Sequence, residues 1–115
     1  CPTCNSIVYN SDTDVTIDVQ TKTIETILND NQVDVADFIK CDIEGGEILA
    51  LTDITVEPIK NRVKSMFIEV HQTNKENNIP WPGNLEQNLQ NIAGVFRNQG
   101  FQIEVTSLDQ LYVYK

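Results

Sequence analysis

Short apolar runs alternate along this chain with segments whose apolar residues recur at helical spacing. The runs Phe38 to Cys41 and Met66 to Val70 predict two central strands of a sheet, and Val15 to Val19 alternates in the manner of a half-exposed strand. Further on, Phe101 to Val105 and Leu111 to Tyr114 alternate on either side of a short polar turn, which predicts an antiparallel hairpin.

Helices are predicted between these strands. The segment Thr23 to Asn31 has helical spacing, and its buried stripe is expected to be Ile24, Ile27 and Leu28. A second helix begins at Glu47, directly after two glycines. A longer helix follows Asn84, a good N-cap, and ends at Gly100, where glycine lets the chain leave the helix. Its buried face is expected to consist of Leu85, Leu89, Ile92 and Phe96.

The order of these elements predicts a single α/β domain over residues 1–115, in which residues 1–14 form an irregular amino-terminal segment. Strands joined by helical crossovers run parallel. We therefore expect a mostly parallel sheet, with the carboxyl-terminal hairpin as its antiparallel part and helices packed on its faces.

The most informative segment joins the first central strand to the helix after it, and from residue 40 to 49 it reads Lys-Cys-Asp-Ile-Glu-Gly-Gly-Glu-Ile-Leu. Asp42 and Glu44 follow the strand, and the two glycines let the backbone turn tightly. Ligands of open α/β sheets bind beyond the carboxyl ends of the strands, so these acids are expected to face a ligand. Glu47, in the first turn of the helix, could instead be a simple partner of the helix dipole.

The second central strand carries Glu69 and ends at His71, the only histidine. Parallel strands joined by a crossover end at the same edge of a sheet, so these two residues are expected to lie near Asp42 and Glu44. An ordinary pKa of about 6.5 suits histidine to general-base catalysis, although a histidine that closes an apolar strand can also be structural. Asp42 could accept a proton or only position the substrate, and positioning is favoured.

These two segments resemble the FkbM-type S-adenosylmethionine-dependent methyltransferases. The turn is similar to that family's F-I-K-x-D-[IV]-E-G-x-E pattern, and Ile68-Glu69-Val70-His71 is similar to its I-E-V-H strand. The helix near residues 21–28 resembles its T-L-D-x-L-L segment. The remaining elements match the carboxyl half of the family, so the resemblance covers roughly Asp18 to Tyr114.

The resemblance implies a Rossmann-like half-sheet, S-adenosylmethionine as cofactor, and transfer of its methyl group to a hydroxyl of a small molecule or glycan. It implies that Asp42, Glu44 and His71 are catalytic and that Asp42 also contacts the cofactor. Glu69 and Trp81 are expected to contact the acceptor, although Trp81 could instead anchor its polar loop to the domain surface.

The family also uses a glycine-rich turn and a ribose-binding acid, whereas this chain has no Gly-x-Gly pattern. It is therefore expected to be the carboxyl-terminal half of a methyltransferase, inactive in isolation. The edge of the strand from Phe38 to Cys41 would then be open. We expect Val15 to Val19 to cover that edge, or a second copy to pair with it in a homodimer.

Two other functions stay open. The acids at the strand ends could hold Mg²⁺ or Mn²⁺ in a metal-dependent hydrolase, which would not require S-adenosylmethionine, although no metal ligand is assigned. Alternatively, the chain could be a binding or assembly module that has kept the fold and lost the chemistry.

The formal charge of −9 argues against nucleic acids and anionic membranes as partners, because both are bound through clustered lysine and arginine. Three cysteines leave one unpaired, which favours a reducing, cytoplasmic location. Cys1 and Cys4 form a C-x-x-C pair, but the chain offers few further zinc ligands, so these thiols are interpreted as incidental.

Overall fold

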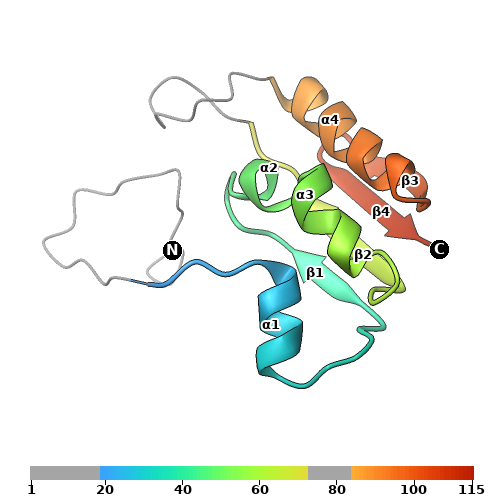
Figure 1. Cartoon of the computed structure of the whole chain (residues 1–115). Coiled ribbons are helices and arrows are strands. Elements are labelled where there is room, and N and C mark those ends of the chain that lie inside the picture. Colours follow the sequence, from blue (N-terminus) through green and yellow to red (C-terminus); the bar gives the residue numbers. More distant parts are fainter. Residues whose placement is uncertain (1–18, 73–83) are drawn as a thin grey trace, which may run out of the picture.

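The computed structural model describes residues 19–72 and 84–115. Four strands form one sheet in the spatial order β1-β2-β4-β3, and they are β1 (Ile39–Cys41), β2 (Ser65–Glu69), β3 (Gln102–Ser107) and β4 (Gln110–Tyr114). The helices, shown in Figure 1, are α1 (Ile24–Asp30), α2 (Glu47–Ala50), α3 (Asp53–Val56), the 3-10 helix η1 (Glu57–Ile59) and α4 (Leu85–Asn98). The predictions for residues 1–18, for the C-x-x-C pair and for Trp81 lie outside the described residues.

The sheet is mixed rather than mostly parallel. β1 and β2 run parallel, with Cys41 opposite Ile68, whereas β4 runs antiparallel to both of its neighbours, β2 and β3. The expectation of a mostly parallel sheet was therefore wrong. The reason is that β4, the second strand of the hairpin, lies beside β2 in place of β3. β4 therefore forms an antiparallel pair on each side. β1 also lies at the outer edge of the described sheet and not at its centre.

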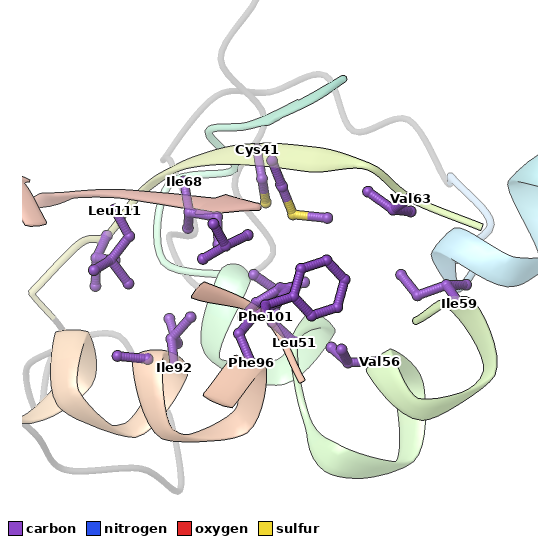
Figure 2. Packing of buried hydrophobic residues seen from close by; sticks show 14 of the residues in the cluster. Cys41, Leu51, Val56, Ile59, Val63, Ile68, Ile92, Phe96, Phe101 and Leu111 are labelled. Carbon is purple, nitrogen blue, oxygen red and sulfur yellow. The ribbon is translucent and has the colours of Figure 1, made fainter. Parts of the chain in front are cut away.

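One face of the sheet forms the core. Burial alternates along β2 and β4, as expected when one face of each strand packs and the other stays partly open. Figure 2 shows Cys41, Ile68 and Leu111 on the sheet side of this core, opposite helix side chains that include Ile92 and Phe96. The Phe96 and Phe101 rings meet edge to face with centroids 5.3 Å apart.

The ends of the helices follow the sequence signals. The Asn84 side chain accepts the main-chain N–H of Gln87, and the Gln87 side chain accepts that of Asn84, so the predicted N-terminus of α4 is confirmed. Gly100 follows with a φ of 88°, a left-handed conformation that suits glycine. The predicted stripe of α1 was partly wrong, because Leu28 is buried but Ile27 is 46% exposed.

The segment expected to cover the outer edge of β1 is described only at Val19, because residues 15–18 lie outside the described residues. Val19 lies in no strand and is 72% exposed, and Phe38 is 57% exposed. Pairing of this edge with a second copy stays a prediction.

Among the helices of residues 19–72 and 84–115, none is long and apolar enough to cross a membrane.

Removing the Phe96 ring should destabilise the domain by about 3–5 kcal/mol, because Phe96→Ala leaves a cavity where a fully buried ring had packed. Urea unfolding of the chain measures the effect. Leu108→Ala is the matched control, since Leu108 is 87% exposed and its loss should change the free energy of unfolding by less than about 0.5 kcal/mol. Equal effects of the two substitutions would contradict this placement of the core.

Candidate active site

The turn between β1 and α2 has an unusual backbone. Glu44 has a φ of 54° and Gly45 a φ of 98°, so two successive residues adopt left-handed conformations. Glycine does so freely, but a residue with a Cβ does so at a cost of roughly 1–3 kcal/mol. The main-chain N–H of Gly46 donates to the carbonyl of Ile43 and closes the turn. This geometry places Asp42 and Glu44 beyond the end of β1 and turns the following Glu47 inward.

Glu47 is completely buried. One carboxylate oxygen, Oε1, lies 2.7 Å from the main-chain nitrogen of His71 and 2.7 Å from Nδ1 of the same residue. The other oxygen, Oε2, accepts the main-chain N–H of Gly45 at 3.2 Å. The interpretation of Glu47 as a simple dipole partner was therefore wrong, since its carboxylate binds the end of another strand.

His71 brings the two strand ends together. Its Nδ1 faces Glu47, whereas its Nε2 lies 3.5 Å from Oδ1 of Asp42 and 3.7 Å from Oε2 of Glu44. The predicted proximity of Asp42, Glu44, Glu69 and His71 is thus observed, and the roles assigned to them stay predictions. The pairing of β2 with the hairpin extends to the residue before His71, because the main-chain N–H of Val70 donates to the carbonyl of Asp109 at 2.7 Å.

Asn88 also positions His71, although it was not among the predicted site residues. This α4 residue is buried, and its Nδ2 donates to the main-chain carbonyl of His71 at 3.0 Å. The sequence does place Asn88 on the apolar face of the helix, because it lies three positions after Leu85 and four before Ile92. A polar residue at a core position of a helix usually has a specific hydrogen-bond partner.

The proximity of Asp42 alters the proton affinity of Glu69. A hydrogen bond with the Asp42 carboxylate, together with the negative charge of that group, raises the pKa of Glu69. Within the described residues, no lysine or arginine pairs with Asp42 or Glu69. This end of the sheet is therefore strongly negative, and a protonated His71 places a positive charge beside Asp42 and Glu44.

The pKa of His71 reflects two opposing effects. Burial lowers it, but the hydrogen bond to Glu47 and the charges of Glu47, Glu44 and Asp42 outweigh burial, so the pKa is raised. Nearby, burial and the charges of Glu47 and Asp42 raise the pKa of the Cys41 thiol to about 12. The thiol therefore stays protonated near neutral pH and takes no part as a nucleophile.

Three of these side chains could hold a metal ion. One ligand atom each from Asp42, Glu69 and His71 lies within 4.8 Å of the other two. A set of two carboxylates and one imidazole suits first-row divalent ions such as Mn²⁺. A separate hollow of about 620 Å³ is lined by polar residues of the α4 amino-terminal region and by none of this cluster, and these residues are Asn84, Glu86, Gln87, Gln90 and Asn91.

Comparison with protein families gives one match. The model of the methyltransferase FkbM domain matches residues 4–103, which is most of the chain. The chain therefore belongs to the FkbM methyltransferase family, as the turn and the Ile68 to His71 strand indicated. Comparisons with curated proteins and with solved structures gave no match.

The single histidine makes the charge of the cluster measurable. Because its folded-state pKa is raised, His71 should titrate in an NMR pH series with a midpoint above the ordinary value of about 6.5. The stability that this interaction contributes is fully present below the unfolded-state pKa and is lost as the pH rises through the folded-state pKa. Asp37→Asn, at an exposed acid paired with Lys64, is the control and should leave the midpoint unchanged. A midpoint at or below 6.5 would mean that the carboxylates do not surround the ring as described.

Proposed function

We propose that this chain forms the acceptor side of an S-adenosylmethionine-dependent O-methyltransferase whose acceptor is a hydroxyl of a small molecule or glycan. The observation that carries the proposal is the convergence of Asp42, Glu44 and His71 beyond the parallel strands β1 and β2, within a domain of the FkbM family. The carboxyl ends of parallel strands are where α/β enzymes bind their ligands. The sheet supports a Rossmann-like half-domain, because it combines this parallel pair with a carboxyl-terminal hairpin.

The negative charge of the cluster fits the proposed cofactor. S-adenosylmethionine supplies a methyl group already activated on a positively charged sulfonium. Asp42 and Glu69 have no lysine or arginine partner among the described residues, so a cationic ligand would relieve their mutual repulsion. This argument supports Asp42 as the residue that faces the cofactor. Contact of Glu69 and Trp81 with the acceptor stays a prediction, and Trp81 lies outside the described residues.

His71 is the proposed proton acceptor. In methyl transfer an O–C bond forms while the S–C bond breaks, and the hydroxyl proton must leave the acceptor oxygen. Nε2 of His71 lies beside Asp42 and Glu44, which can hold a polyhydroxylated acceptor in line by accepting hydrogen bonds from its neighbouring hydroxyls, while the reacting hydroxyl donates to Nε2. Only the unprotonated ring can take the proton, so the raised pKa of His71 implies that turnover increases with pH through that pKa.

The cofactor pocket needs residues beyond those seen at this cluster. The chain contains no Gly-x-Gly turn of the kind that lets a backbone approach a nucleotide closely. We propose that this turn is supplied by a part of the gene product outside these 115 residues, so activity is best measured on the complete gene product.

Removal of either central side chain should impair turnover. In the complete gene product, His71→Ala and Asp42→Asn should each lower kcat by about two to four orders of magnitude, because proton transfer and positioning act mainly in the transition state. Methyl transfer from labelled S-adenosylmethionine measures the effect, and Glu104→Gln, at an exposed acid of β3, is the control. Wild-type turnover in both site variants would reject the site.

The trio of Asp42, Glu69 and His71 favours a second candidate, a metal-dependent hydrolase. This function predicts that Mn²⁺ alone binds the chain with measurable heat in a calorimetric titration and that Glu69→Gln abolishes that heat. It also predicts hydrolysis without S-adenosylmethionine. Methyl transfer by a metal-free preparation treated with chelator would exclude this second function.

A further inference from the structure

Glu47 is a buried acid that the proposed reaction does not use directly. Its side chain is 0% exposed, whereas the side chains of Asp42 and Glu44 are 34% and 48% exposed. A carboxylate is rarely buried so completely unless donors surround it. The main-chain N–H groups of Gly45 and His71 donate to it, and Nδ1 of the His71 ring lies at hydrogen-bond distance.

The contact with the ring decides which of its nitrogens carries the proton. Oε1 of Glu47 lies 2.7 Å from Nδ1 of His71, and an ionised carboxylate can only accept hydrogen bonds. If Nδ1 carried a lone pair, two acceptors would face each other at that distance. Nδ1 therefore donates, and in the neutral ring the lone pair lies on Nε2. Nε2 is the nitrogen that faces Asp42 and Glu44.

The same contacts fix the direction of the ring. Oε1 holds both the ring and the main-chain N–H of His71, while the bond from Gly45 to Oε2 keeps the carboxylate from rotating. Asn88 holds the carbonyl of His71 from the side of α4. The ring therefore has little freedom to turn Nε2 away from the acids.

We propose that Glu47 is a positioning residue for His71, which fixes the Nδ1–H tautomer and directs the Nε2 lone pair toward the acceptor hydroxyl. The identity of the acceptor rests on the proposed methyl transfer, whereas the tautomer follows from the contacts alone. The other charged groups that face the ring are Asp42 and Glu44 from the turn after β1 and Glu69 from β2. None of these groups faces Nδ1 as Glu47 does.

The tautomer can be read directly, because His71 is the only histidine of the chain. In untagged chain labelled with ¹⁵N-histidine, at a pH above the His71 pKa, the imidazole spectrum should show a protonated Nδ1 and an unprotonated Nε2. Glu47→Met removes every acceptor and should give a mixture of tautomers. Glu47→Gln keeps an acceptor oxygen and should retain the Nδ1–H form. Glu104→Gln is the control and should match the wild type.

Two results would overturn the proposal. One is a wild-type spectrum with the proton on Nε2, which needs no variant and so stays decisive even if Glu47→Met fails to fold. The other is a folded Glu47→Met protein with the wild-type tautomer, since Glu47 would then serve packing alone.

Kinetics of the complete gene product add a second readout. Glu47→Met should lower kcat by about 10- to 100-fold with KM little changed, by analogy with carboxylates that orient metal-bound histidines through the other ring nitrogen. Glu47→Gln should recover part of the loss. Unchanged kcat in Glu47→Met would contradict the positioning role. Failure of the wild type to methylate any hydroxyl would instead reject the proposed function, while the NMR result on Glu47 would stand.

Discussion

The buried contact between Glu47 and His71 is the constraint on which the site depends. It joins the first residue of α2 to the end of β2, and so ties the turn after one parallel strand to the end of the next. A buried carboxylate that loses its partner typically costs about 3–5 kcal/mol, which is a large part of a small domain's stability. The turn therefore adopts the conformation that places the Glu47 carboxylate against His71, including the left-handed backbone at Glu44 and Gly45. The backbone strain at Glu44 and the burial of Glu47 thus have the same cause.

The consequence of this arrangement is electrostatic. Glu47 binds Nδ1 of the imidazole, so Nε2 faces Asp42 and Glu44. Glu69 in turn shares a hydrogen bond with Asp42. The cluster thus favours cations, whether a proton on His71 or a positively charged ligand. In the proposed methyl transfer this preference would suit a sulfonium cofactor, because Asp42 and Glu69 would contribute negative charge where that cation binds.

Much of the architecture could be predicted from local signals. Alternating and continuous apolar runs gave the strands, the Asn84 and Gln87 pair gave the start of α4, and Gly100 gave its end, because each is a short-range effect of backbone chemistry. The insertion of β4 beside β2 could not be read in the same way, since hairpin signals specify the turn and not which strand meets the rest of the sheet.

The site was foreseen in its outline but not in its support. The parallel arrangement of β1 and β2 sufficed to bring Asp42 and His71 together. The burial of Glu47 depends on a left-handed turn that involves a residue other than glycine, and no sequence rule predicts that conformation at Glu44. The role of Asn88 could not be predicted for a different reason. Its hydrogen-bond partner is the main-chain carbonyl of His71, which is far from it in sequence.

The proposed role of this acid and histidine cluster is to receive a hydroxyl for methylation. The most direct measurement follows a ¹³C-labelled methyl group from S-adenosylmethionine by NMR in the complete gene product, with a panel of small-molecule and glycan hydroxyl acceptors. The proposed role predicts a new O-methyl resonance with the wild type and its loss in His71→Ala. Transfer of the label to nitrogen or carbon, or an equal O-methyl signal from His71→Ala, would contradict it.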